Sequence, residues 1–131
     1  MLNERITPRL FTFSIPTTGA GTSDTFGGPL MKFAGQVVAV EVTAGATIAS
    51  DPTDYTTLAL KNGSTTVASW STASGAVTAD TGKALTMSTT AANTKFAVGD
   101  QLNFTKTDSG AGKALTAPTH VSVWYIAGTE N

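Results

Sequence analysis

The sequence predicts an all-β protein, a single jelly-roll or Greek-key β-sandwich of about eight strands. Helix-favouring residues such as Leu, Glu, Lys and Arg are scarce, whereas Thr and Val, which suit strands better, are abundant. Short alternating runs of apolar and polar residues recur between turn-forming segments, which is typical of a sandwich or barrel. The length of 131 residues fits one domain with one hydrophobic core.

The N-terminal part is expected to hold one strand between two irregular segments. The first nine residues are interpreted as an extended arm, and residues 10–15 alternate as a strand that ends at Pro16. Residues 17–29 are rich in Gly, Thr and Ser, and Phe26 is their only large apolar side chain. With so little to bury, this segment is predicted to be a long loop or an extended arm.

Residues 1–29 are therefore expected to form the arm, the first strand and a loop, and residues 30–131 the sandwich domain. The further predicted strands span residues 36–43, 55–61, 65–70, 85–87, 101–107 and 120–127, and residues 95–97 are interpreted as a short apolar approach to the turn at Val98-Gly99-Asp100. Along the first of them, Val38, Val40 and Val42 are expected to share one face, because side chains alternate along a strand.

The clearest local feature is the dipeptide Asn62-Gly63 between two alternating runs. Both residues tolerate positive φ, which the two central positions of a type I′ turn require. The sequence therefore predicts a β-hairpin here, and loops over residues 47–54 and 71–82 on either side of it.

Composition argues against several kinds of partner. Only 13% of residues are charged, the formal net charge is −1, and the eight basic residues are scattered singly, so no nucleic-acid partner is expected. No apolar run is long enough for a membrane span, and the N-terminus has no signal-peptide pattern, so no membrane association is expected. Cysteine is absent, which fits assembly in a reducing cytoplasm.

Residues suited to catalysis are few, and neither a metal site nor a cofactor is predicted. His120 is the only histidine, no Ser-His-Asp spacing supports it, and it is expected to be a partly exposed edge residue. Asp51 and Asp54 flank a proline and either form a turn or supply some of the oxygen ligands of a calcium ion. Asp100 is expected to cap the turn after Gly99. A hydrolase would need carboxylates to converge in a cleft, and the candidates are Asp51, Asp54, Asp80, Asp100 and Asp108.

Five residues are candidates for contact with a partner. Arg5 and Arg9 belong to the N-terminal arm and are either tethers to a carboxylate-bearing partner or part of a disordered terminus. Trp70 and Trp124 are either a stacking platform for sugar rings or, as their size favours, residues of the core or of a subunit interface. Phe26 is the apolar residue of the 17–29 segment.

Residues 31 to 127 resemble small β-sandwich proteins of tailed-bacteriophage virions, most closely the capsid decoration (cement) proteins. The resemblance rests on the run that starts at Leu58-Ala59-Leu60-Lys61-Asn62-Gly63, on residues 95–104 and on the closing Val121-Ser122-Val123-Trp124-Tyr125. These are strand and turn signatures.

The resemblance implies a non-enzymatic structural protein that is made in the host cytoplasm and located on the capsid surface of the virion. It would be a homo-oligomer, with a trimer favoured, that binds the major capsid protein and clamps its subunits. Residues 1–9 and 17–29 match the extended termini with which such proteins reach under a neighbour. A receptor-binding module of a fibre or spike that binds carbohydrate is the alternative, and it rests on the two tryptophans.

Overall fold

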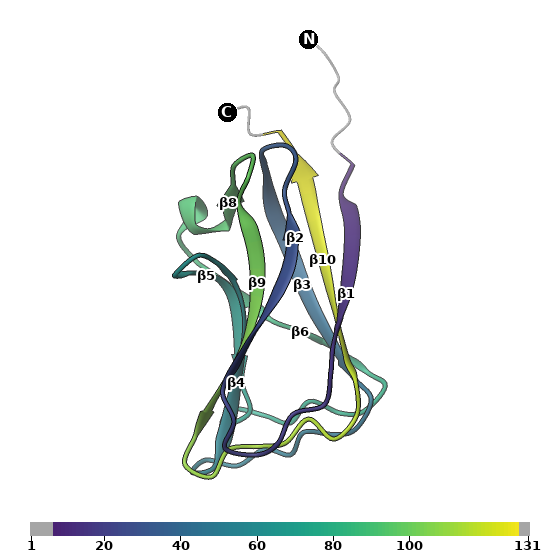
Figure 1. The fold of residues 1–131 in the computed structure, drawn as a ribbon, viewed down its shortest axis with the longest axis vertical. Coiled ribbons are helices and arrows are strands. Elements are labelled where there is room, and N and C mark those ends of the chain that lie inside the picture. Colours follow the sequence, from purple (N-terminus) through teal and green to yellow (C-terminus); the bar gives the residue numbers. More distant parts are fainter. Residues whose placement is uncertain (1–6, 129–131) are drawn as a thin grey trace.

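The computed structural model describes residues 7–128, and over this range the protein consists of two five-stranded antiparallel sheets packed face to face, with one short 3-10 helix (Figure 1). The elements are β1 (Arg9–Ile15), β2 (Asp24–Leu30), β3 (Gly35–Ala44), β4 (Tyr55–Asn62), β5 (Thr65–Ser71), β6 (Gly82–Ala84), β7 (Thr86–Met87), η1 (Ala91–Thr94), β8 (Lys95–Phe96), β9 (Gln101–Ser109) and β10 (Thr119–Ala127). The predicted all-β sandwich is confirmed.

Strand pairing follows the jelly-roll order. One sheet runs β1-β10-β3-β6, with β8 also paired to β3, and the other runs β2-β9-β4-β5-β7. The pairings are nested from the ends of the chain toward its middle. β1 pairs with β10, β2 with β9, β3 with β6 and β8, and the consecutive strands β4 and β5 pair with each other. The chain is thus a long antiparallel hairpin rolled into two layers, as in a jelly roll.

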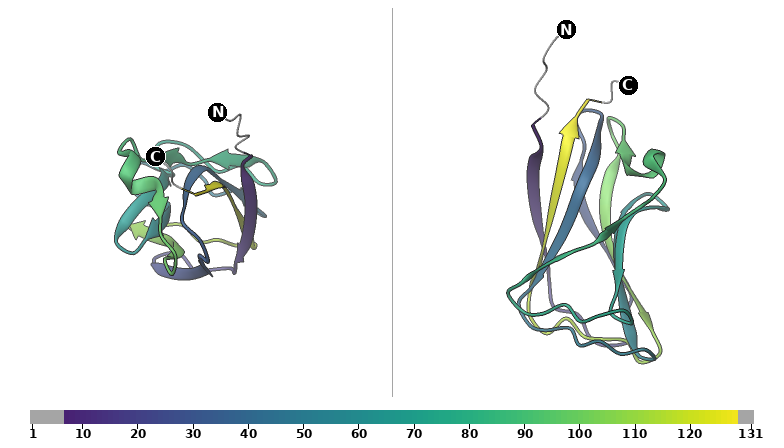
Figure 2. Two further views of the ribbon diagram at one scale, coloured as in Figure 1. Left: turned by 90° about the horizontal axis from the view of Figure 1, so that it is seen from above. Right: turned by 180° about the vertical axis from the view of Figure 1, so that it is seen from behind.

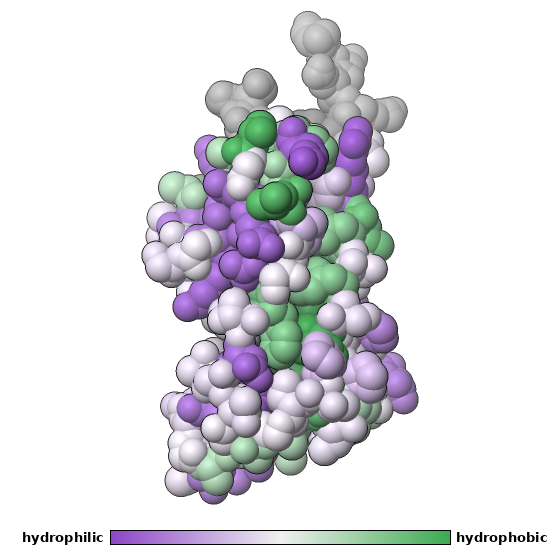
Figure 3. Space-filling model, viewed as in Figure 1, coloured by the Kyte–Doolittle hydropathy of each residue, from purple (hydrophilic) through white to green (hydrophobic). Residues whose placement is uncertain are grey.

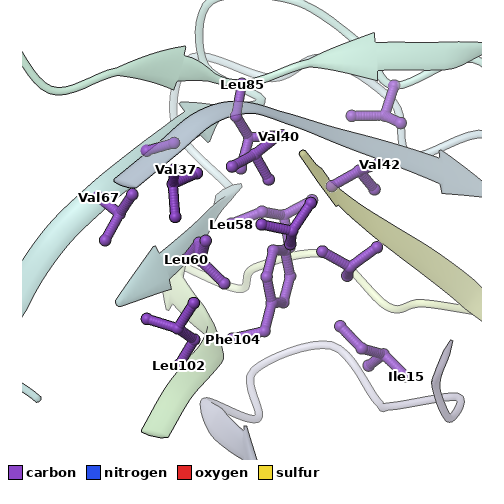
Figure 4. Packing of buried hydrophobic residues seen from close by; sticks show 14 of the residues in the cluster. Ile15, Val37, Val40, Val42, Leu58, Leu60, Val67, Leu85, Leu102 and Phe104 are labelled. Atoms are coloured by element: carbon purple, nitrogen blue, oxygen red, sulfur yellow. The ribbon is translucent and has the colours of Figure 1, made fainter. Parts of the chain in front are cut away.

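The core lies between the two sheets, where alternate residues of both sheets meet (Figure 4). β3 contributes Val40 and Val42, β4 contributes Leu58 and Leu60, and β9 contributes Leu102 and Phe104. All of these side chains are buried. On β1, Phe11, Phe13 and Ile15 face inward while the residues between them are more exposed, as the alternation predicts.

The prediction of a loop or arm over residues 17–29 is wrong for its second half. Residues 24–30 form β2, which pairs with β9 at the edge of the second sheet, and Phe26 lies opposite Phe104. β1 is likewise an edge strand of the first sheet. Residues 9–15 and 24–30 are therefore parts of the sandwich, and residues 1–6, which include Arg5, lie outside the described residues.

A β-bulge changes the predicted face of β3. The pairs Trp124–Ala39 and Tyr125–Val37 leave Val38 without a partner on β10. Val38 is 38% exposed while Val37 is buried, so Val38 does not share the inner face with Val40 and Val42 as expected. An extra residue in one strand shifts the alternation by one, which produces this exchange.

The hairpin is confirmed, but its turn lies one residue later than expected. Asn62 still pairs with Thr65, so the central residues are Gly63 and Ser64. Gly63 has φ +64° and neither neighbour has a positive φ, which matches a type II′ turn rather than type I′. Asn62 is held in the strand because its side-chain amide donates to the carboxylate of Asp100.

The strand predicted at residues 85–87 is confirmed only for residues 86–87, which form β7, because the chain crosses from one sheet to the other at Leu85. β6 pairs with β3 in one sheet and β7 pairs with β5 in the other, and Leu85 between them is buried. The Leu85 amide donates to Val40 at 2.9 Å, so this crossing closes one side of the sandwich.

The two ends of the sandwich hold different turns and connections of the chain (Figures 1 and 2). At one end lie both limits of the described chain, residues 7 and 128, with the β2–β3 connection, the β4–β5 turn and the β8–β9 turn. We call this the terminal end. The opposite end holds the long connections over residues 16–23, 45–54 and 110–118.

Candidate functional site

The exposed large hydrophobic side chains of residues 7–128 all lie toward the terminal end. They are Leu10 (52% exposed), Leu30 (55%), Phe33 (36%), Val38 (38%) and Val98 (66%). Leu10 and Val38 lie in the first halves of β1 and β3, Leu30 ends β2, and Phe33 and Val98 lie in the connections. Figure 3 shows hydrophobic residues at this end, mixed with hydrophilic ones. Such clustering on one part of a surface is typical of an interaction site.

A network of aromatic rings lies beneath this surface. Tyr125 packs on Phe33 (5.9 Å between ring centroids), Phe11 (5.7 Å) and Phe96 (6.0 Å). Phe11 then stacks on Phe13 at 6.3 Å, and Phe13 contacts the buried Phe104 edge-on at 6.4 Å. The exposed Phe33 is thus connected to the core by packed rings, which hold this surface in a fixed shape.

Two of the predicted partner-contact residues lie beside this surface. Arg9 begins β1 with an exposed side chain, next to Leu10. Trp124 is half-buried on the outer face of its sheet, in register with Leu10 on β1 and with Ala39 on β3. Leu10 and Trp124 therefore lie together on the outer face, whereas the Arg9 side chain, one residue earlier on β1, points to the other side of the strand.

Phe26 and Trp70 are placed elsewhere, where each packs against the core. Phe26 is half-buried in β2. Trp70 belongs to the sheet opposite that of Trp124; its indole N–H donates to the Gly75 carbonyl at 2.9 Å, and the Lys83 ammonium lies 3.6 Å from its ring centroid. One ring face of Trp70 is therefore occupied by a cation, and the two tryptophans do not form a common stacking platform. Trp70 therefore packs against the core, as the size of its side chain favoured.

A shallow polar depression of about 550 Å³ lies beside β5 and β7. It is lined mainly by uncharged hydrogen-bonding side chains, those of Ser64, Thr65, Thr66, Ser69, Thr86, Ser88, Thr89 and Asn93, with Met87. A second depression of about 350 Å³ on the other side of Met87 and Ser88 extends toward Val38. This surface lacks a charged or aromatic lining residue, so it suits a neutral polar ligand.

Two of the carboxylates that a hydrolase would need, Asp51 and Asp100, are engaged in local hydrogen bonds. Asp51 accepts from the amides of Thr53 (2.8 Å) and Asp54 (3.0 Å), which confirms the predicted turn. These bonds, first that from Asp54, hold the pKa of Asp51 below its usual value, and the nearby Lys113 lowers it further. Among residues 7–128 no three His, Asp or Glu side chains gather as metal ligands would.

Asp100 caps a turn as expected. Gly99 has φ +90°, and the Asp100 carboxylate accepts from the Ala97 amide at 2.8 Å and from Asn62 at 2.9 Å. These two hydrogen bonds lower the pKa of Asp100. His120 is exposed, as expected, but its strand β10 is not an edge strand, and its ring nitrogen Nδ1 lies 2.9 Å from the Ser14 hydroxyl.

A buried ion pair near the opposite end was not anticipated. Lys106 alternates with Leu102 and Phe104 and is fully buried with them. Its ammonium donates to the carboxylate of Asp108 (2.7 Å) and to the carbonyls of Thr22 (2.8 Å) and Gly19 (3.2 Å). A lysine has three such donors, and all three are used.

Asp108 links this ion pair to β4 and to the connection over residues 16–23. Its carboxylate also accepts from the Thr56 hydroxyl (2.6 Å) and the Gly21 amide (2.7 Å). Burial raises the pKa of Asp108, but the hydrogen bonds from Lys106 and Thr56 and the Lys106 charge outweigh it, so the pKa lies below its ordinary value. The network fastens residues 19–23 to β9, which makes it a structural feature of the opposite end.

Sequence reasoning missed the exposed residues Leu30, Phe33 and Val98. Each lies within two residues of a glycine or proline: Leu30 is at the end of β2, and Phe33 and Val98 are in turn-forming connections, where no strand face buries a large apolar side chain. Large apolar residues in turn segments are thus the signal that would have found this surface. That these residues gather at one end could not be seen from the sequence, because they come from β1, β2, β3 and two connections.

The part of the chain that the structure describes contains no helix with the length and hydrophobicity needed to cross a bilayer. A scan of family models and searches of curated proteins and of solved structures found no match to this chain.

Proposed function

We propose that this protein is a non-enzymatic virion component, a decoration protein that binds the outer surface of a bacteriophage head and stabilises contacts between major capsid protein subunits. The observation that carries the proposal is the clustering of the exposed large hydrophobic residues at the terminal end. A rigid sandwich with such a surface is suited to attach to a protein shell by burying that surface against it. The strand and turn signatures in residues 58–63, 95–104 and 121–125 support the same proposal.

Attachment by many weak contacts suits a small protein of this kind. A lattice of identical subunits offers many equivalent sites, and an oligomer that engages several of them at once binds far more firmly than one chain does. We propose a homo-oligomer, with a trimer favoured. Sedimentation velocity of the purified protein would then give a mass near three times the 13.3 kDa of the chain, and a purely monomeric boundary would contradict this part.

The proposal is tested on virus particles. Purified virions, labelled with an antibody against this chain and examined by electron microscopy, are expected to show it over the whole head surface. Shells assembled without the chain should bind the purified protein and withstand heating better afterwards. Label confined to the tail or its fibres, or absent from the particles, would contradict the proposal.

The second candidate is a carbohydrate-binding module, and the observation that favours it is the polar depression beside β5 and β7. Hydroxyl and amide groups such as those of Thr86, Ser88 and Asn93 can both donate to and accept from sugar hydroxyls. A glycan array would detect binding, and Asn93→Ala should abolish it. Trp124→Ala is the comparison, since Trp124 does not line this depression.

A further inference from the structure

Charges in residues 7–128 are separated along the long axis of the sandwich. The terminal end carries four cations, Arg9, Lys32, Lys61 and Lys95, and one carboxylate, Asp100, a surplus of three positive charges. The Asp100 carboxylate is engaged by Asn62 and the Ala97 amide. The rest of the sandwich carries six carboxylates, Asp24, Glu41, Asp51, Asp54, Asp80 and Asp108, against three lysines, Lys83, Lys106 and Lys113. Residues 7–128 carry seven cations and seven carboxylates, so their formal balance of zero combines a positive end with a negative end.

The positive end is also the apolar end. Lys32 is next to the exposed Phe33 in the β2–β3 connection, and Arg9 is next to Leu10. Lys95 begins β8, which leads into the turn that carries Val98. Three exposed cations of this end thus lie within three residues of an exposed apolar side chain.

We propose that the terminal end docks on an acidic protein surface that also offers apolar contacts. This deepens the proposed function, on which it rests: the capsid face that receives the chain would be negative, and the sandwich would stand on its terminal end with the opposite end pointing outward. The positive charges orient the incoming molecule and speed its association, and the apolar side chains supply most of the affinity once water is excluded.

A protein partner accounts for this surface better than a nucleic acid or a membrane does. Four cations separated by apolar side chains do not form the continuous basic stripe that follows a phosphate backbone. The apolar residues surround the end, on β1, β2, β3 and two connections, and do not lie on one amphipathic face of the kind that rests in a membrane interface. Side chains on several sides of an end fit a socket between protein subunits.

The first test compares two variants with the same change in net charge. Lys32→Gln combined with Lys95→Gln removes two positive charges from the terminal end, and Thr78→Glu combined with Thr116→Glu adds two negative charges to exposed positions near the opposite end. Binding to shells assembled without the chain is measured by co-sedimentation at low and high salt. The lysine variant is expected to bind about fivefold to tenfold more weakly, and the threonine variant close to wild type. Val98→Ser should also weaken binding, and thermal melting confirms that each variant is folded.

The second test does not depend on the capsid. A soluble peptide of alternating Glu and Leu is titrated into the ¹⁵N-labelled protein, and amide shifts are expected at residues 9–10, 30–38 and 95–101, to be reduced by added salt. Phosphatidylcholine–phosphatidylglycerol vesicles and duplex DNA are run in parallel, and weaker effects are expected from both.

The outcomes separate this inference from the proposed function. If the wild type binds shells and the lysine variant binds equally well, the docking end is wrong while the decoration function stands. If the wild type does not bind shells but the peptide shifts concentrate at the terminal end, the decoration function is wrong and the acidic docking surface stands. Shifts centred elsewhere, or tighter binding to vesicles or DNA, would overturn the inference.

Discussion

Lys106 is a charged side chain without exposed surface, and its environment explains how the fold tolerates it. The aliphatic part of the side chain lies on the inner face with Leu102 and Phe104, and the ammonium reaches three acceptors at the edge of the core. A buried charge is tolerated when it is paired and fully hydrogen-bonded, as it is here.

We predict that Lys106→Met destabilises the protein by about 3–5 kcal/mol, because it leaves the Asp108 carboxylate without its counterion. Guanidinium denaturation measures the change. Lys113→Met is the matched control: Lys113 pairs with Asp51 at 3.3 Å in a partly exposed position, and its loss should cost less than about 1 kcal/mol. Equal costs for the two variants would show that the buried pair is not important for stability.

The lowered pKa of Asp108 predicts a pH dependence. A carboxyl group with a lower pKa in the folded state stabilises the protein above the unfolded pKa of about 3.9, and this contribution is lost as the pH falls through the folded value. Asp108→Asn should therefore be much less stable than wild type at pH 7, and the difference should shrink on acidification to about pH 2. Denaturation at several pH values measures it. Asp51 and Asp100 are present in both proteins, so their contributions cancel, and a constant difference would contradict the prediction.

Among the elements, β2 shows how context overrides local preference. Its sequence, DTFGGPL, contains two glycines and a proline, which strands disfavour. The proline is acceptable at a sheet edge, where no partner needs its missing N–H. The pairing with β9 departs from regular register between Gly27 and Leu30, which accommodates the two glycines and the proline.

We predict that Gly28→Ala destabilises the protein by about 1–3 kcal/mol, because a Cβ there would overlap the Leu102 carbonyl and the backbone would have to move. Gly27→Ala is the control in the same strand. Its Cβ would meet the end of the Gln101 side chain at 3.1 Å and Asn103 at 4.0 Å, with no backbone atom in the way, so a smaller loss is expected. Thermal unfolding compares the two, and a larger loss for Gly27→Ala would show that the tight approach of β2 to β9 is not a constraint.

At the scale of the whole molecule, the jelly roll joins the two halves of the chain. β1 pairs with β10 and β2 with β9, so most of the sheet structure depends on residues far apart in sequence. Each of these pairings closes a long loop before its contacts form, which slows folding.

We therefore predict refolding on a timescale of milliseconds to seconds at 25 °C, as in other small all-β domains. Stopped-flow dilution from denaturant, followed by tryptophan fluorescence, measures the rate. Far-ultraviolet circular dichroism should change with the same time constant. Microsecond relaxation would contradict the prediction, since it would require structure dominated by local contacts.

The sequence alone was enough to predict the all-β class and the strands with clear alternation, because a strand buried on one face repeats every two residues. It also predicted the turns at Asp51 and Asp100, whose side chains bond to backbone amides within three residues. Tertiary structure decided β2, the bulge at Val38 and the buried Lys106, since each depends on a partner strand or loop distant in sequence. It also decided the apolar, positive terminal end, because residues from β1, β2, β3 and two turns become neighbours only when the two sheets pack together.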